Sequence, residues 1–339
     1  MTCRIPIVLL GLAAVVASSA ACRRGARETA LTITLGAYTV PKEAYEQQLI
    51  PAFKKLWKEQ TGKDVEFQAS YVASGQQARA IVGGFEADVA ALSLEGDVDL
   101  ITRAGLIKHD WKAGPQGGMV TTSIVVLGVR PGNPKGIRGW EDLARADIDV
   151  VTPDPATSGG AMWNINAVWG AGLRASGGDE QAATGLLERI RRRIKALDTS
   201  GRESFATFER GVGDAAITYE NELLRARREG RKYDIVRPAS TIRIDNPVAI
   251  VDANVERHGN RAVVEAFVQF LWGAEAQRVF ADYGFRPVLP EVAAQVVERF
   301  PVPEDLFTIA DLGGWQAIRD KLYAPDGIWA RVNRAVAGP

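Results

Sequence analysis

A short stretch rich in serine and glycine, residues 155–161 with the sequence PATSGGA, has the residue types best suited to binding an anion. It follows an apolar run at 150–152 and precedes a segment whose apolar residues recur at helical spacing. Ser158 is suited to cap that helix, and Gly159 and Gly160 leave its first N–H groups open to an external group. These groups form the positive end of the helix dipole, so they can bind a small anion without lysine or arginine. The spacing is equally compatible with an ordinary capped helix start.

Two other junctions between a strand and a helix repeat this pattern. Residues 74–76 (SGQ) follow the predicted strand 65–71, and residues 199–202 (TSGR) precede a helical segment that carries Phe205 and Phe208. Either stretch alone is typical of a plain helix cap, with a solvated arginine at position 202. Together with residues 155–161, however, the junction at 74–76 gives one such site in each lobe and predicts anion-binding backbone around Ser74; residues 199–202 are a third candidate.

Signatures of enzymes and metal sites are missing from the sequence. His109 and His258 are the only histidines and lie far apart, which argues against a histidine-based triad and a histidine-rich metal site. No nucleophile elbow and no phosphate-binding GK[ST] loop occurs. Residues 211–216 (GVGDAA) approximate a dinucleotide fingerprint, but they precede a predicted strand where they should follow one. We therefore predict a binding protein that is not an enzyme and has no cofactor or metal.

Composition limits the partners and the architecture. The chain has 339 residues, with 41 basic and 41 acidic side chains. This balance gives no reason to expect a nucleic-acid partner, which would require a basic stripe. The length exceeds that of a usual single domain, so one large or two medium lobes are expected.

The N-terminus predicts export. Arg4 precedes an uncharged apolar run, residues 5–21, which is too short for a typical membrane span and is typical of a signal-peptide core. Residues 19–22 (SAAC) resemble the lipobox of bacterial lipoproteins, with Cys22 as the lipidated residue. We therefore predict a signal peptide at 1–21 and a lipidated tether at 22–29; cleavage as an ordinary secretory peptide is the alternative. Cys3 lies in the leader, so the mature chain has a single cysteine and no disulfide.

Strands and helices alternate through the rest of the chain. Strands are predicted at 31–35, 65–71 and 87–94, with helices from 41 to 62 and from 74 to 83. A second set follows, with strands at 150–152 and 215–219. It also has a helix that begins at 159 and two further helices over 186–197 and 204–211. Such alternation predicts an α/β fold with mainly parallel sheets flanked by helices.

Two segments, Ser123–Leu127 and Val248–Val251, are expected to cross between lobes. Lobe one is then residues 30–120 plus 250–339, and lobe two is residues 121–249. A cleft between two such lobes is a favoured place for a ligand.

The chain resembles the periplasmic sulfate-binding proteins of ABC transporters over nearly its whole mature length. The resemblance depends on several blocks, of which the TSGGA sequence is the most specific in this combination. These blocks are SGQQA at 74–78, EADV at 86–89, GNPKGI at 132–137, TSGGAMWN at 157–164, RGVGD at 210–214, ENE at 220–222, FTI at 307–309 and GGW at 313–315.

This resemblance implies a type II periplasmic-binding-protein fold, in which neutral donors hold sulfate between two lobes. Carried over to this sequence, the donors are the N–H of Ser74, the hydroxyl of Ser158, the N–H groups of Gly159 and Gly160, and an N–H near Gly201. It also implies a periplasmic or envelope location, with the permease subunits of an ABC importer as partners and the membrane reached through an N-terminal lipid.

Three departures from the family pattern leave the identity of the anion open. Tyr219 stands where a tryptophan usually precedes ENE, and a phenol can accept as well as donate a hydrogen bond. Thr39 replaces an acidic residue, and Glu95 adds a carboxylate that would favour phosphate if it faced the cleft. The expected ligand is sulfate or thiosulfate, with phosphate or molybdate as alternatives, and a sensory anion-binding lipoprotein is an alternative role.

Overall fold

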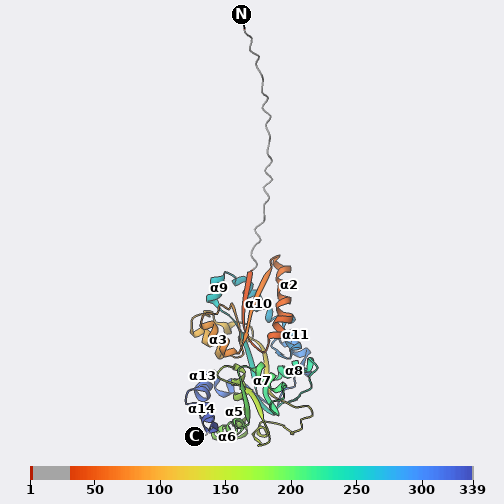
Figure 1. Ribbon diagram of the computed structural model, residues 1–339, viewed down its shortest axis with the longest axis vertical. Helices are drawn as coiled ribbons and strands as arrows, with labels where there is room; N and C mark the ends of the chain where they lie inside the picture. Colours follow the sequence, from red (N-terminus) through yellow and green to blue (C-terminus); the bar gives the residue numbers. More distant parts are fainter. Residues whose placement is uncertain (3–30, 338–339) are drawn as a thin grey trace.

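The computed structural model describes residues 1–2 and 31–337, and residues 31–337 form two lobes stacked along the long axis of the molecule (Figure 1). From residue 3 on, the predicted signal peptide, Cys22 and the predicted tether lie outside the described residues. No helix in the described part of the chain combines the length and the apolar character needed to cross a membrane.

Lobe one is built on a four-stranded sheet covered by helices on both faces. Its strands, in spatial order, are β2 (Val65–Val72), β1 (Leu31–Tyr38), β3 (Val89–Ala91) and the C-terminal half of β9 (Ser240–Ile250). The first three are parallel, and β9 is antiparallel to β3. Helices α2 (Ile50–Thr61) and α10 (Arg261–Leu271) lie on one side, and α3 (Ser74–Val82) and α9 (Asp252–His258) lie on the other (Figure 1). Phe53 packs edge-on against Phe267 at a centroid distance of 5.1 Å, in the core beneath α2 and α10.

Lobe two repeats this arrangement. Its strands are β6 (Ile194–Asp198), β5 (Val150–Pro153), β7 (Ala215–Tyr219) and the C-terminal half of β4 (Met119–Val129). β5 is parallel to both β6 and β7, whereas β4 is antiparallel to β7. Four helices cover the sheet: α5 (Gly159–Ala175), α6 (Glu180–Arg191), α7 (Gly201–Glu209) and α8 (Glu220–Arg228). In each lobe the chain therefore enters helices from the carboxyl ends of parallel strands.

Strands β4 and β9 connect the lobes. They pair with each other in antiparallel register, for example Ser123 with Ile244. Beyond this shared stretch, β9 continues into lobe one beside β3, and β4 continues into lobe two beside β7. Three short strands attach to this pair: β10 (Arg286–Pro287) to β4 within the shared stretch, and β8 (Asp234–Val236) and β11 (Asp305–Phe307) to the lobe-two ends of β4 and β9.

The C-terminal segment, residues 305–337, packs on lobe two, although all of residues 250–339 were expected in lobe one. β11 pairs with the lobe-two end of β9, so the chain after it stays on that lobe. The indole of Trp315, in α13 (Gly314–Ile318), lies edge-on to Trp163 at 4.7 Å between ring centroids. In α14 (Ile328–Ala337), Asn333 accepts a hydrogen bond from Arg191 of α6 at 2.7 Å. The remaining helices are α1 (Lys42–Ala44), α4 (Glu95–Arg103), α11 (Ala274–Asp282) and α12 (Pro290–Gln295).

Two local predictions differ from the structure. The helix expected over 186–197 begins earlier, at Glu180, and ends at Arg191, and the residues after it form β6. This strand pairs in parallel with β5, where Ala196 faces Val151, so tertiary pairing overrides the apparent helical spacing. The strand expected over 87–94 is confined to Val89–Ala91.

Candidate anion-binding site

A small cavity lies where the two lobes meet, with a volume of about 20 Å³ for the centre of a water molecule. That is enough for a water or a compact ion and too small for a large organic ligand. Helices α3, α5, α7 and α8 all begin beside it, three of them at predicted anion-binding junctions. It is lined by Tyr38, Thr39, Val40, Ala73, Ser74, Ser93, Pro153, Ser158, Gly160, Asn164, Gly201, Ile217, Thr218, Tyr219 and Glu222.

The start of α5 offers the most open donors. Ser158 is the N-cap, and its Oγ accepts from the N–H of Ala161 at 3.3 Å, which confirms the predicted cap and leaves the hydroxyl hydrogen free to donate. Within the described residues, the N–H groups of Gly159 and Gly160 donate to no protein acceptor, as expected in the first turn of a helix. A Cβ at Gly159 would lie 2.9 Å from Leu94 Cδ2, so only glycine lets the lobes come this close.

On the lobe-one side, the hydroxyl of Ser74 is already committed. It donates to Asp97 Oδ2 at 2.6 Å and accepts from the N–H of Ser93 at 2.9 Å. The expectation that Ser74 caps α3 is therefore wrong: Ala73 is the N-cap, and no side chain caps this helix. Ser74 can offer a ligand its backbone N–H alone. Burial raises the pKa of Asp97, which shares the space beside α5.

The start of α7 brings an arginine to the edge of the cavity without leaving its charge free. Ser200 caps the helix by accepting from Glu203 N at 3.2 Å, and Gly201 lines the cavity. The next residue, Arg202, forms ion pairs with Glu43 in lobe one and, at 3.0 Å, with Glu222 in lobe two. Its charge is thus balanced by carboxylates, and a ligand would meet mainly neutral donors.

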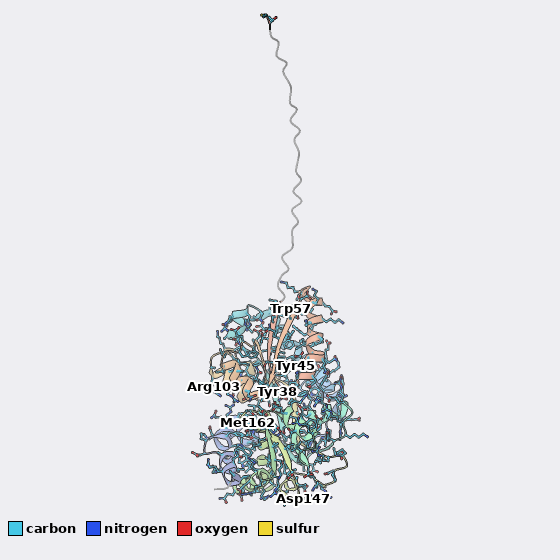
Figure 2. The ribbon with its side chains drawn as sticks, in the orientation of Figure 1. Tyr38, Tyr45, Trp57, Arg103, Asp147 and Met162 are labelled. Carbon is cyan, nitrogen blue, oxygen red and sulfur yellow. The ribbon has the colours of Figure 1, made fainter. Side chains whose placement is uncertain are left out.

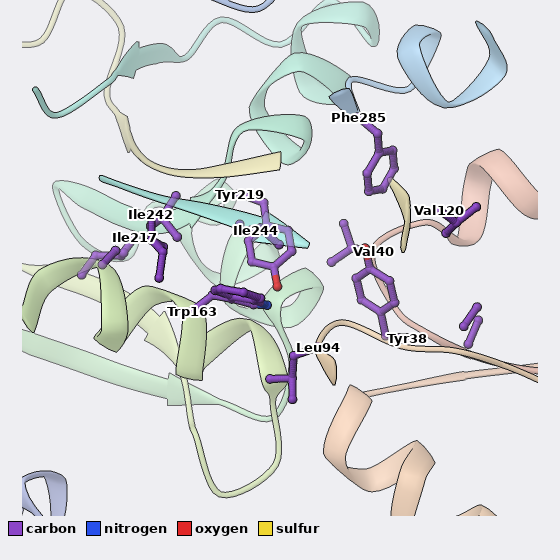
Figure 3. Close-up of a cluster of buried hydrophobic side chains, with 14 of the residues drawn as sticks. Tyr38, Val40, Leu94, Val120, Trp163, Ile217, Tyr219, Ile242, Ile244 and Phe285 are labelled. Carbon is purple, nitrogen blue, oxygen red and sulfur yellow. The ribbon is translucent and has the colours of Figure 1, made fainter. Parts of the chain in front are cut away.

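Two tyrosine hydroxyls complete the wall. Tyr219, at the end of β7, lies with its Oη 2.7 Å from Ser93 Oγ in the other lobe. Tyr38, at the end of β1, is buried, and its hydroxyl has no hydrogen-bond partner among the described residues. Figure 3 shows both rings in the buried cluster between the lobes, and Figure 2 places Tyr38 at the level where the lobes meet. Burial raises the pKa of both phenols, so both remain protonated donors.

The charged groups around the cavity are paired with one another, so a ligand meets mainly neutral groups. The lining contains no lysine or arginine within the described residues, and its one carboxylate, Glu222, is shared between Arg202 and Arg225. Glu95 does not line the cavity and instead forms an ion pair with Lys112. The carboxylate considered as a cleft acceptor for phosphate is therefore directed elsewhere.

Comparisons with known proteins agree with this architecture. Residues 33–286 match the model of a family described as bacterial extracellular solute-binding protein. The chain belongs to this family of solute-binding proteins. A sulfate-binding protein from Synechococcus elongatus is 45% identical over 308 residues, which is 90% of this chain and 87% of the relative. A thiosulfate-binding protein from Pseudomonas aeruginosa is 34% identical over 91% of this chain and 94% of its own length.

A solved structure extends this similarity to three dimensions. The sulfate-binding protein SubI from Mycobacterium tuberculosis aligns with a TM-score of 0.80 and 38% identity, over 86% of this chain and 99% of that one. The fold of this solute-binding protein is accordingly that of the type II periplasmic binding proteins: two α/β lobes joined by crossing strands.

Five of the six ligand residues predicted for this solute-binding protein line the cavity: Ser74, Ser158, Gly160, Gly201 and Tyr219. The sixth, Gly159, adjoins it at the start of α5. Sequence reasoning did not select Tyr38, Ser93 or Asn164 as site residues. Tyr38 lies beyond the strand predicted over 31–35, and the extension of β1 to residue 38 brings it to the cleft, which the carboxyl ends of parallel strands face. Ser93 lies near the carboxyl end of the strand predicted over 87–94, which was an available signal, whereas Asn164 lies inside a helix and carries no comparable signal.

The described residues of this solute-binding protein contain no group of three histidine, cysteine, aspartate or glutamate side chains arranged to hold a metal ion. Neither histidine lies at the cavity. His109 contacts Asp252 at 2.6 Å, and His258 contacts Asp88 at 2.7 Å, both within lobe one.

Proposed function

We propose that this solute-binding protein binds sulfate between its lobes outside the cytoplasmic membrane and delivers it to an ABC importer. The observation that carries the proposal is the convergence of helix starts on one small cavity whose lining, in the part of the chain that the structure describes, has no lysine or arginine. Four helices begin there, and Ser158 and Tyr38 add hydroxyls. Helix N-termini stabilise an anion by N–H donation and by the helix dipole.

Sulfate matches this donor set chemically. It is fully ionised at neutral pH and can only accept hydrogen bonds. The ligand residues we propose are those predicted from the sequence: backbone N–H groups of Ser74, Gly159, Gly160 and Gly201, the hydroxyl of Ser158 and that of Tyr219. Tyr38 joins them, because its buried hydroxyl has no hydrogen-bond partner among the residues that the structure describes.

The relatives support sulfate and closely similar ligands. Proteins named for sulfate and for thiosulfate binding both share more than a third of their aligned residues with this chain, at 45% and 34% identity. Thiosulfate has the same charge and a tetrahedral shape, so it is the second ligand we propose. The cavity is small, so either anion would have to enter it without its shell of water.

Titration calorimetry with sulfate, thiosulfate, molybdate and phosphate tests the ligand. Sulfate or thiosulfate should bind with the highest affinity. Phosphate as the tightest ligand, or no binding of any of the four, contradicts the proposal. Loss of radiolabelled sulfate uptake in cells that lack this protein, restored by its expression, tests delivery to a transporter; unchanged uptake would instead favour a sensory role.

We also propose that the mature protein is held in the cell envelope by lipid on Cys22. The SAAC sequence at 19–22 supports this, because a lipobox cysteine becomes the N-terminus of the mature chain. Metabolic labelling with palmitate should mark the wild type and leave Cys22→Ala unlabelled. Labelling that persists in the variant would contradict the anchor.

A further inference from the structure

Two hydroxyl groups at the cavity wall are bonded to each other across the lobes. Tyr219 Oη, in lobe two, lies 2.7 Å from Ser93 Oγ, in the lobe-one segment between β3 and α4. Both residues are buried and both line the cavity. The carbonyl of Ser93 also accepts from Trp163 Nε1 at 2.8 Å and from Asn246 Nδ2 at 2.9 Å, so its backbone is held firmly. The hydroxyl pair is therefore a defined part of the closed site.

The pair can present either a donor or an acceptor to a ligand. Each hydroxyl has one hydrogen and two lone pairs. One hydrogen lies between the two oxygens, and the other hydrogen and the remaining lone pairs are left for the cavity. Because either oxygen can be the donor, the shared hydrogen can reverse its direction without moving a heavy atom. Burial raises the pKa of Tyr219, so neither hydroxyl gains a charge.

The backbone groups proposed to contact the anion have no such freedom. The N–H groups of Gly159 and Gly160 can only donate. An indole at position 219 would also only donate, since a tryptophan nitrogen has no lone pair for hydrogen bonding. A donor-only wall discriminates against a ligand O–H, because burying that group without an acceptor weakens binding roughly ten- to hundredfold.

A second acceptor lies at the same wall. Asn164 Nδ2 donates to the carbonyl of Ile217 at 2.8 Å and to Thr152 Oγ1 at 3.0 Å. Because a carbonyl can only accept, this contact fixes the amide orientation and makes Oδ1 the free acceptor. Oδ1 is buried and has no hydrogen-bond partner among the described residues. An unsatisfied buried acceptor is costly, and a ligand with a hydrogen to donate relieves such a cost.

We infer that this site also takes singly protonated tetrahedral oxyanions, of the hydrogen phosphate class, with the Tyr219–Ser93 pair accepting the hydrogen of the ligand. The inference rests on the proposed function and widens its ligand class. Sulfate remains the tighter ligand, because the helix starts supply donors only. The affinity for hydrogen phosphate lies within about a hundredfold of that for sulfate, since its O–H finds an acceptor.

Calorimetry on the purified protein at mildly alkaline pH tests this inference, since sulfate and inorganic phosphate are then both dianions and only phosphate carries an O–H. The informative variant combines Ser93→Ala with Tyr219→Trp, which leaves an indole donor in place of the pair. Its ratio of phosphate to sulfate affinity should fall roughly ten- to hundredfold below that of the wild type. Tyr233→Phe, which removes a tyrosine hydroxyl outside the cavity lining, is the matched control.

The outcomes separate the inference from the proposed function. Sulfate binding with no measurable phosphate binding overturns the inference and leaves the function intact. The same holds if both anions bind but the double variant keeps the wild-type affinity ratio. If the wild type binds neither anion, the proposed function fails as well. Thermal melting of the double variant verifies that it is folded, and Tyr219→Phe alone provides a second, smaller substitution that should lower the ratio less.

Discussion

Arg202 of lobe two donates from Nη2 to the backbone carbonyl of Val40 in lobe one, at 2.9 Å. The same guanidinium forms ion pairs with Glu43 in lobe one and Glu222 in lobe two, so one side chain joins both halves of the molecule beside the cavity. The indole of Trp163 makes a further bridge to the other lobe through the carbonyl of Ser93. These contacts describe a closed form, in which the anion site is complete.

Arg202→Gln should weaken sulfate binding. The substitution breaks the connection to Glu43 and Val40 and leaves Glu222 paired with Arg225 alone, so the closed form loses stability relative to the open one. A loss of about 1–3 kcal/mol corresponds to roughly ten- to hundredfold lower affinity. Calorimetry gives the affinity, and small-angle scattering with and without sulfate shows whether closure persists.

Arg192→Gln is the control for this prediction. Arg192 follows α6 and pairs with Glu188 on the surface of lobe two, where an exposed ion pair contributes little. Its substitution should leave affinity and closure as in the wild type. Equal affinities for both variants would show that Arg202 does not take part in closure.

Ser158→Ala should lower both sulfate affinity and stability. The hydroxyl is proposed to donate to the anion, and its loss should cost about 1–3 kcal/mol of binding free energy. It also caps α5, and the loss of a cap lowers the free energy of unfolding by about 1 kcal/mol. Calorimetry and urea unfolding without ligand separate the two effects.

Asp179→Ala provides the matched control for the cap. Asp179 caps α6 by accepting from Gln181 N at 2.8 Å, outside the cavity lining. This variant should lose a similar free energy of unfolding and keep its sulfate affinity. If Ser158→Ala also kept its affinity, the hydroxyl would have no part in binding.

The helix starts at the site were predictable because they depend on residues that are neighbours in the sequence. A serine and two glycines after a strand determine the open helix start at Ser158 and Gly160, whatever the rest of the chain does. Gly201 follows the same rule. The parallel order of strands within each lobe also follows from alternating strands and helices.

The remaining features depend on contacts between distant segments. Nothing near Ser74 signals that its hydroxyl bonds Asp97, a partner 23 residues away, in place of capping its own helix. The strand at Ile194–Asp198 has helical spacing in isolation and becomes a strand through pairing with β5. Likewise, the packing of Trp315 on Trp163 places the C-terminal segment on lobe two, although sequence order suggested a return to lobe one.

Gly159→Ala should reduce affinity through sterics alone. An added Cβ would lie 2.9 Å from Leu94 Cδ2 and 3.1 Å from Asp97 Oδ2, both of which belong to lobe one. The contact exists only when the lobes close, so the added methyl group destabilises the closed form and leaves the open form unaffected. At least a tenfold loss of sulfate affinity should appear by calorimetry, equivalent to about 1.4 kcal/mol.

Gly185→Ala tests whether glycine replacement in a helix has this effect in general. Gly185 lies in α6, and its added Cβ would approach nothing closer than Arg189 Nη1 at 3.7 Å. This variant should keep its affinity and become more stable by roughly 0.5–1 kcal/mol, because alanine is the better helix former. An unchanged affinity in Gly159→Ala would show that the lobes tolerate a methyl group there.

His258 should make the stability of lobe one depend on pH. Partial burial lowers its pKa, but hydrogen bonds to Asp88 and Glu86 outweigh that effect and raise the pKa above 6.5. A group with a raised pKa in the folded state stabilises the fold below its unfolded pKa, and this contribution is lost as the pH rises through the folded pKa. The melting temperature should therefore fall as the pH rises above 6.5, and His258→Gln should flatten this decline.

Because His258 lies outside the cavity lining, sulfate affinity should not follow the same curve. A melting temperature that declines equally in wild type and variant would assign the pH dependence to another group.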